Sequence, residues 1–463
     1  MLIKQFVDEG LGNSSYLLAS EETSQAILID AERDIDRYLG VAEGLGLRLT
    51  HALDTHLHND FVSSAIEAAA RGLAVGASAD AGLTFEHLRL GDGARLSLGD
   101  LQVETIATPG HTPEHVSFAV RKTGGTSVTA IFTGGALVVG GAARTDLLGP
   151  DATPGLTHQL YHTLHERLMT LPDDVAVYPT HGAGSFCAAP ASSARITTVG
   201  QERRQNRLAQ ACSEAEFAAL ALEDLPSYPT YFRYMRELNR RGPRLLGGLP
   251  VPAPLMAETV RGGIAEGIAV LDIRSPRDFM AGHVPGSYGI PLGTPLITWA
   301  GWVVPFGSAL ILVADHPEEQ SEAVRQLIRI GYDDLRGYLD GGMGAWRAAG
   351  FPVGQMPVKS RQELLVEMEK GSAALVLDVR QDAEWRAGHI PGARHIEAGA
   401  LPAVHPDLAK DAPIVVHCGH ADRSTVALSL LARQGYRALA LLDGGFSGWV
   451  KAGYPVERGD KPA

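Results

Sequence analysis

The second half of this 463-residue chain contains an internal repeat, which restricts the possible folds more than any other feature. Three stretches of one copy return in the other, two of them 106 positions later and one 103 positions later: Ala269-Val-Leu-Asp-Ile-Arg as Leu375-Val-Leu-Asp-Val-Arg, Ala281-Gly-His-Val-Pro-Gly as Ala387-Gly-His-Ile-Pro-Gly, and Asp340-Gly-Gly as Asp443-Gly-Gly. A copy of about 105 residues is long enough for one hydrophobic core. Because each copy alternates apolar runs with amphipathic segments, the repeat predicts two α/β domains with parallel sheets.

The first 200 residues follow a different pattern. Short apolar runs such as Ser15-Tyr-Leu-Leu-Ala and Leu101-Gln-Val-Glu-Thr-Ile are separated by turn residues, and an Ala-rich segment at 62–70 has helical periodicity. This mixture predicts sheet layers covered by helices. Polar and Pro/Gly-rich residues then suggest helices and a linker. We predict three domains, which span 1–243, 244–356 and 357–463.

Charge and cysteine content exclude several classes of protein. Lys and Arg number 40 against 53 Asp and Glu, a formal net charge of −13, which argues against a nucleic-acid or anionic membrane partner. We find neither a transmembrane-length apolar run nor a secretion signal at the start. Three cysteines are too few for a disulfide framework, so we expect a cytoplasmic protein. A homo-oligomer stays open.

One of these cysteines lies in a loop suited to a nucleophile. The apolar run that begins at Pro413 ends at Cys418, and Gly419-His-Ala-Asp-Arg423 follows before Ser424 opens a helix. Loop N–H groups and a helix N-terminus favour an anion at this position, and Arg423 adds positive charge. We therefore predict that Cys418 is a thiolate nucleophile and not a buried structural cysteine.

Both copies resemble rhodanese domains, the sulfurtransferase fold. The resemblance rests on the Asp-x-Arg strand end, the Gly-His-[Ile/Val]-Pro-Gly turn, the Cys-x₄-Arg-Ser loop and the final Gly-Gly-x-x-x-Trp, over roughly residues 255–460. It implies that Cys418 accepts a sulfane sulfur as a persulfide, and that Asp378 and His389 are structural. It also implies that the transferred sulfur is held, beside Arg423, by the loop residues Gly419, His420, Ala421, Asp422 and Ser424.

The first copy lacks the reactive groups. Its aligned loop places Ala314 at the cysteine position and Glu319 at the arginine position. Without a thiol or a cation, this copy is expected to have a structural or interdomain role.

Histidines in three loops of the first domain predict a metal site. Asp54-Thr-His56-Leu-His58-Asn-Asp60 lies between a predicted strand and a helix, and His111 and His181 each lie beside Gly or Pro. Imidazole and carboxylate groups on neighbouring loops are the usual ligands of Zn²⁺ or Fe²⁺.

Residues 1–200 resemble the metallo-β-lactamase fold, which implies an αββα sandwich. Within that fold they resemble the persulfide dioxygenase group, which is also similar to glyoxalase II. The combination with two rhodanese copies looks like the dioxygenase–rhodanese fusions of bacterial sulfide metabolism. The resemblance implies a single Fe(II) held by two histidines, here His56 and His111, and by one aspartate. Gly135 occupies that aspartate position, and Phe61 replaces a further histidine of the fold. Asp146 is a possible replacement for the lost carboxylate.

Three histidines then remain for one metal: His56, His58 and His111, with Asp60 or His181 close by. This set suits iron or zinc, and an empty site is the alternative. Cys187 follows His181 by six residues and is either a sulfur relay or a buried apolar residue.

We expect an enzyme of sulfur metabolism that oxidises a low-molecular-weight persulfide, such as glutathione persulfide, to sulfite and transfers sulfane sulfur through Cys418. Three alternatives stay open: a rhodanese-type sulfurtransferase with a degenerate lactamase-like domain, a zinc-dependent thioester hydrolase, and a sulfur carrier without turnover.

Overall fold

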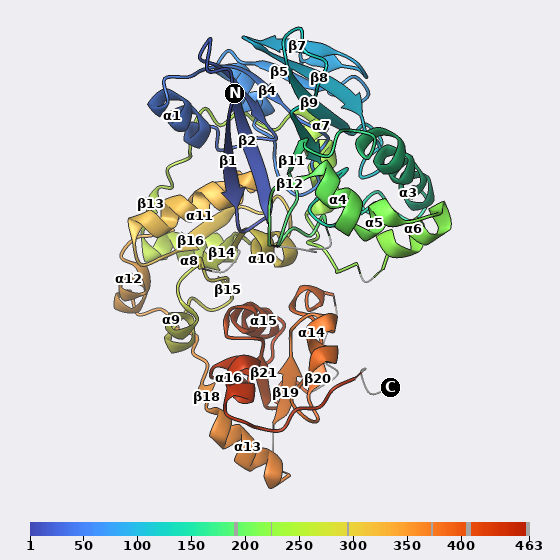
Figure 1. Cartoon of the computed structure of the whole chain (residues 1–463). Coiled ribbons are helices and arrows are strands. Elements are labelled where there is room, and N and C mark those ends of the chain that lie inside the picture. The colour runs from blue at the N-terminus through green and yellow to red at the C-terminus, as the bar shows by residue number, and fades with distance from the viewer. Residues whose placement is uncertain (189–192, 224, 294–295, 372–373, 404–408, 460–463) are drawn as a thin grey trace. The chain divides into compact units, whose positions relative to one another are not determined.

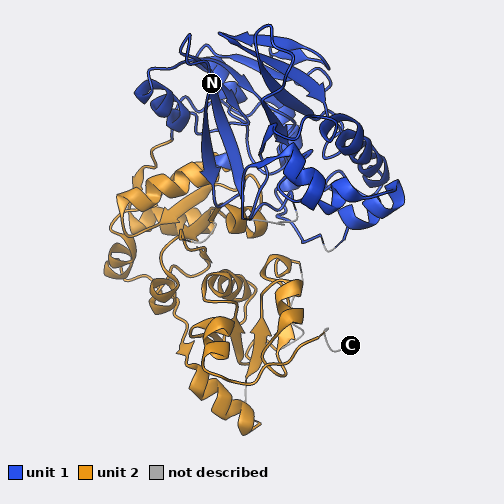
Figure 2. Cartoon of the chain, in the orientation of Figure 1, with its two compact units in different colours: residues 1–249, 328–331 blue, residues 250–327, 332–463 orange. Residues whose placement is uncertain are grey.

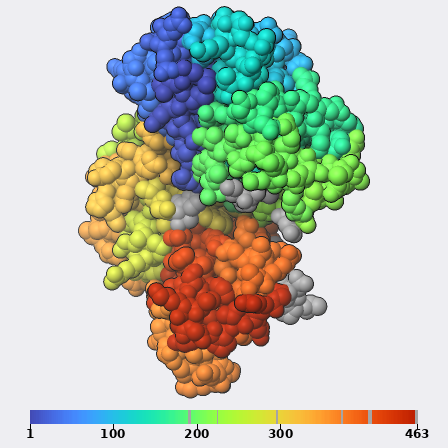
Figure 3. Space-filling model, in the orientation of Figure 1, coloured from blue at the N-terminus to red at the C-terminus, as the bar shows by residue number. Residues whose placement is uncertain are grey.

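The computed structural model describes residues 1–188, 193–223, 225–293, 296–371, 374–403 and 409–459 (Figures 1 and 3). The chain forms two compact units: residues 1–249 with 328–331, and residues 250–327 with 332–463 (Figure 2). Among the described helices, none is both long and apolar enough to cross a membrane. The predicted division into three domains at 243–244 and 356–357 stays a prediction.

The first unit is built on two six-stranded sheets. The first sheet runs in chain order: β1 (Leu2–Asp8), β2 (Asn13–Ala19), β3 (Gln25–Ile29), β4 (Arg48–Leu53), β5 (Ala74–Ser78) and β6 (Leu88–Leu90). The second runs in reverse chain order: β12 (Thr197–Thr198), β11 (Ala176–Pro179), β10 (Ala130–Gly134), β9 (Val116–Lys122), β8 (Leu101–Ala107) and β7 (Arg95–Leu98).

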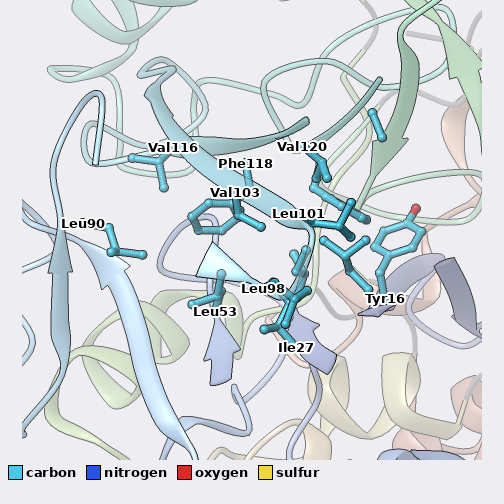
Figure 4. Close-up of a cluster of buried hydrophobic side chains, with 14 residues drawn as sticks. Tyr16, Ile27, Leu53, Leu90, Leu98, Leu101, Val103, Val116, Phe118 and Val120 are labelled. Carbon is cyan, nitrogen blue, oxygen red and sulfur yellow. The ribbon is translucent and has the colours of Figure 1, made fainter. Parts of the chain in front are cut away.

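Alternating side chains of β2 explain the layers. Tyr16 and Leu18 belong to a buried cluster shared with the second sheet, where Phe118 and Val103 lie (Figure 4). Leu17, between them, packs on the opposite face of the sheet. Because successive side chains of a strand point to opposite faces, one strand supplies both cores.

Helices cover the outer face of each sheet. The first sheet carries α1 (Asp36–Gly44) and α2 (Ala65–Ala70). The outer core of the second sheet includes residues of α3 (Thr153–His162), the π-helix η1 (Thr163–Leu168), α4 (Val199–Gln205), α5 (Arg207–Gln210) and α6 (Glu214–Ala221). A further helix, α7 (Phe232–Arg241), follows. The predicted αββα sandwich is confirmed.

The second unit contains two five-stranded parallel sheets of the same strand order, as the repeat predicts. The first copy has the order β13 (Pro254–Leu255), β17 (Leu335–Leu339), β16 (Leu310–Val313), β14 (Ala269–Asp272) and β15 (Tyr288–Gly289). The second has β18 (Val358–Lys359), β22 (Leu439–Leu442), β21 (Ile414–His417), β19 (Leu375–Asp378) and β20 (Arg394–His395).

Helices connect these strands in both copies. In the first copy they are α8 (Ala257–Ala265), α9 (Pro276–Ala281), α10 (Leu296–Val303), α11 (Pro317–Arg329) and α12 (Gly342–Ala348). In the second they are α13 (Arg361–Glu369), α14 (Asp382–Ala387), the short 3₁₀ helix η2 (Ala398–Ala400), α15 (Asp422–Arg433) and α16 (Gly445–Lys451).

The repeated motifs have structural contacts in the second copy. Asp378 accepts hydrogen bonds from Arg380, which also donates to the Gly388 carbonyl at 2.7 Å. The ring of His389 stacks on Trp385 at 3.6 Å between centroids. These contacts order the turn between β19 and β20, in keeping with the structural role expected of Asp378 and His389.

Candidate metal centre and sulfur-transfer loop

Three loops of the first unit bring their histidines together, each just after a strand. His56 follows β4, His111 follows β8 and His181 follows β11. One ring nitrogen of each lies within 4.8 Å of the others, and all three side chains are buried. His181 Nε2 is 3.4 Å from His56 Nε2. Strands of both sheets therefore contribute to one cluster, which we call the three-histidine cluster.

Hydrogen bonds orient these rings from outside. His111 Nδ1 donates to the Arg144 carbonyl at 2.7 Å, so its Nε2, which has no protein partner, carries the lone pair. The Nδ1 of His181 lies 3.0 Å from the Asn13 side-chain oxygen. A ring held through one nitrogen and open at the other is the usual state of a metal ligand.

Burial also keeps the cluster neutral. Desolvation and the neighbouring imidazoles lower the pKa of His111 to about 3. Desolvation and the nearby His58 lower the pKa of His181 to about 3. The pKa of His56 is lowered well below its usual value for the same reasons. Neutral imidazole is the metal-binding form, so the cluster can accept a cation at physiological pH.

His58 belongs to a second, overlapping group with Asp60 and His181. Its Nε2 lies 3.3 Å from Asp30, and its ring stacks on Phe61 at 4.0 Å between centroids. Of the predicted set, the structure therefore brings His56 and His111 together with His181, and places His58 nearer the carboxylates. Asp60 accepts from the Asn13 amide at 2.7 Å and leaves its other oxygen without a protein partner.

Gly135 has no room for the missing aspartate. A Cβ added there would lie 2.6 Å from the His111 ring and 2.9 Å from the Ala143 Cβ. Asp146 offers no replacement, because Arg144 holds both of its oxygens at 2.6 and 2.7 Å. The residues present therefore fit a divalent metal with the three nitrogen donors of His56, His111 and His181.

Asp30, which sequence reasoning missed, ties two of the histidine loops together. It directly follows β3 with a φ of +50° and accepts hydrogen bonds from the hydroxyls of Thr55 and Thr180. These threonines directly precede His56 and His181. The sequence does contain two Thr-His pairs, but Asp30, which accepts hydrogen bonds from both threonines, is distant from them in the chain.

His115 is a second missed residue. It is buried, stacks on the His56 ring at 4.8 Å between centroids, and accepts a hydrogen bond at Nε2 from the Gly135 N–H at 3.0 Å. It supports the three-histidine cluster and has no free nitrogen facing it.

Cys187 is fully buried beside the second group. Burial and the adjacent Asp60 carboxylate raise the pKa of Cys187 well above its usual value, so the thiol stays protonated. Cys212 lies exposed just before α6.

Cys418 lies at the end of β21, buried and free of any disulfide. The first turn of α16 fixes its loop: the Phe446 N–H donates to the Cys418 carbonyl at 2.7 Å, and the Ser447 N–H donates to the Gly419 carbonyl at 3.0 Å. Helix α15 begins at Asp422, so Ser424, predicted to open it, lies in its first turn with an unpartnered hydroxyl. His420 and Ala421 complete the loop between strand and helix.

Arg423 lies beside the cysteine loop, but its charge is already paired. Its two terminal nitrogens contact Glu384 of α14 at 2.5 and 2.9 Å. A Cβ at Gly419 would lie 3.4 Å from Arg423, which places the guanidinium against the loop. Although burial opposes its charge, Glu384 has a lowered pKa because of Arg423. Glu384 is a further residue that local sequence patterns did not reveal.

The aligned loop of the first copy is filled by its own carboxylate. Glu319 accepts hydrogen bonds from the N–H groups of Asp315 and His316, both at 3.1 Å. Ala314 removes the thiol, and Glu319 occupies amides that would otherwise face an anion.

Comparison with known proteins agrees with both halves of the chain. The model of the rhodanese-like domain matches residues 256–349 and 360–452. The N-terminal region is 33% identical over 222 residues to human persulfide dioxygenase ETHE1, mitochondrial, which covers 46% of this chain and 78% of the relative. Thiosulfate sulfurtransferase GlpE of Pseudomonas putida is 37% identical over 95 residues, 20% of this chain and 86% of the relative.

A crystal structure of a metallo-beta-lactamase from Staphylococcus aureus aligns over most of the chain. The TM-score is 0.67 at 29% identity, over 73% of this chain and 98% of the other.

Proposed function

Because this chain belongs to the persulfide dioxygenase ETHE1 family through its N-terminal region and continues with two rhodanese-like domains, we propose that it oxidises a low-molecular-weight persulfide to sulfite and transfers sulfane sulfur through Cys418. The observation that carries the oxidase half is the buried, neutral cluster of His56, His111 and His181. Glutathione persulfide is the proposed substrate, with O₂ and water as co-reactants. The products are the thiol, sulfite and two protons.

Fe(II) held by the three-histidine cluster would supply the redox chemistry between O₂ and sulfur when bound. The residues of the chain hold and shield that site. The Arg144 carbonyl and the Asn13 side chain fix two of the imidazoles. Burial excludes bulk water from the cluster.

The second half of the proposal is a two-step sulfur transfer. The Cys418 thiolate attacks the outer sulfur of a persulfide, the sulfur–sulfur bond breaks, and the thiol leaves with the proton that Cys418 lost. Sulfite then takes the outer sulfur from the Cys418 persulfide, which forms thiosulfate and restores the thiolate. Tethering both halves raises the effective concentration of sulfite near Cys418.

Oxygen uptake with glutathione persulfide tests the oxidase half. The iron-loaded wild type should consume O₂ and release sulfite, and Cys418→Ser should retain this activity while it loses thiosulfate formation. His181→Ala should lose most of the bound iron and the O₂ uptake. An iron-loaded wild type that takes up no O₂ contradicts the proposal.

A second candidate is a sulfurtransferase whose first domain holds no redox metal. The observations that favour it are the glycine at position 135 and the Phe61 ring that covers His58. Elemental analysis of anaerobically purified protein separates the cases. Iron supports the dioxygenase, absence of metal supports the sulfurtransferase alone, and zinc with thioester cleavage in the absence of O₂ supports the hydrolase.

A further inference from the structure

A second group of metal-ligand side chains lies at the surface of the first unit. His158 and His162 are one turn apart on α3, and Glu214 is the first residue of α6. Their ligand atoms all lie within 4.8 Å of one another. Glu214 bridges the two rings, with one oxygen 2.8 Å from His158 Nδ1 and the other 3.1 Å from His162 Nε2.

The ring of His162 is also held from its far side. Its Nδ1 contacts Glu166 at 2.7 Å, while its Nε2 faces Glu214. A carboxylate on the distal nitrogen is the usual outer contact of a metal-bound histidine. Glu166 lies in the π-helix η1, a type of segment that is often found at functional sites. The group therefore has two nitrogen donors, one carboxylate donor and an orienting carboxylate.

We propose that His158, His162 and Glu214 form a divalent transition-metal site, with Zn²⁺ as the ligand that this donor set fits. Histidines four residues apart on a helix present their rings to one point. Two imidazoles and a carboxylate are a known zinc set with room for water at the fourth position. Side-chain exposures of 57%, 38% and 50% leave the group open to ions from solution. Figure 3 shows the green segment around residues 150–220 on the visible face.

A cation bound by His158, His162 and Glu214 would join helices α3 and α6, which support the three-histidine cluster. Leu160 of α3 and Phe217 of α6 belong to one buried cluster. On its other side α3 meets the loop that carries His111. Thr163 at the start of η1 donates to the Pro109 carbonyl at 2.7 Å, and a Cβ on Gly110 would lie only 2.5 Å from the Leu160 Cβ. Zinc at the surface would therefore stiffen the helix beneath a ligand of the three-histidine cluster.

The site is independent of the reaction proposed for the central cluster, so binding is measured directly. The iron-loaded full-length protein is titrated with Zn²⁺ by calorimetry, in parallel with the double variant His158→Ala/His162→Ala. The wild type should bind one more zinc than the double variant, and zinc should raise the thermal unfolding midpoint of the wild type only. Any zinc that exchanges into the three-histidine cluster does so in both proteins, so it does not change the difference in zinc stoichiometry between them.

Two single variants sharpen the test. Glu166→Gln should weaken zinc binding at this site about tenfold or more, since it removes the outer carboxylate. His165→Asn is the matched control, because His165 lies on the same segment but bonds the Tyr161 carbonyl, and it should bind zinc as the wild type does. Equal zinc stoichiometry in the wild type and the double variant overturns the proposal, as does full zinc affinity in Glu166→Gln.

Discussion

Gly445 and Gly342 offer a matched test of how the cysteine loop is built. They occupy the same position of the two copies, at the start of α16 and α12, with φ values of +55° and +54°. A Cβ at Gly342 would lie 3.5 Å from the Ala314 carbonyl oxygen, an ordinary contact. A Cβ at Gly445 would lie 2.5, 2.6 and 2.9 Å from three loop carbonyl oxygens, those of His420, Cys418 and Gly419.

The two alanine substitutions should therefore differ in cost. Both introduce a side chain at positive φ, which costs about 1–2 kcal/mol. Gly445→Ala adds overpacking against backbone atoms, which costs about 1–3 kcal/mol more. Gly342→Ala should lower the free energy of unfolding by about 1–2 kcal/mol, and Gly445→Ala by about 2–5 kcal/mol. Gly445→Ala should also displace the loop and reduce sulfur transfer by at least about tenfold.

Tryptophan fluorescence during urea unfolding measures the loss of stability in the second unit, which contains both glycines. All five tryptophans of the chain lie in the second unit: Trp299, Trp302, Trp346, Trp385 and Trp449. Sulfur transfer from thiosulfate to cyanide supplies the second readout. If both variants lose equal stability, or if Gly445→Ala keeps full sulfur transfer, the loop is not held by this close approach and the reasoning is refuted.

Three further predictions concern the metal cluster and the silent copy. Asp30→Asn should weaken metal binding about 10- to 100-fold, measured by competition with a chelator, because it loosens the loops of both Thr-His pairs. The metal-free protein should lose stability in acid: the pKa of His111 falls from 6.5 to about 3 on folding, so the unfolded chain binds more protons between those values and stability rises with pH. Acidification from pH 7 to pH 5 should cost about 2 kcal/mol for this histidine, measured by urea unfolding followed by circular dichroism, and a flat profile would contradict its burial as a neutral ring. Finally, Ala314→Cys in a Cys418→Ser background should not restore sulfur transfer, because Glu319 still occupies the loop amides; persulfide labelling at the new thiol would show this to be wrong.

Features that depend on local periodicity were predictable from the sequence. The repeat indicated two parallel α/β domains, and the two sheets share one strand order. The apolar run Ser15-Tyr-Leu-Leu-Ala indicated a strand, and it lies in β2, whose residues divide between two cores. Both predictions succeed because strand and helix periodicities act over a few residues.

The grouping of the histidines was harder to predict. His56 and His58 are two residues apart, which suggested one shared cation. The structure instead turns His58 toward Asp30, and completes the cluster with His181, a residue more than a hundred positions away. Contacts such as these depend on how two sheets pack, and a single sequence carries no local signal for that. The Arg423–Glu384 pair escaped prediction for the same reason.

The position of Asp30 has a consequence for the order in which the first unit matures. Its carboxylate accepts a hydrogen bond from Thr55, which precedes His56 after β4 of the first sheet. It accepts another from Thr180, which precedes His181 after β11 of the second sheet. The ligand set is thus complete only after the ribosome has synthesised the chain past residue 181 and the two sheets have docked. Under the proposed function, metal capture is then a late event in the biogenesis of this unit.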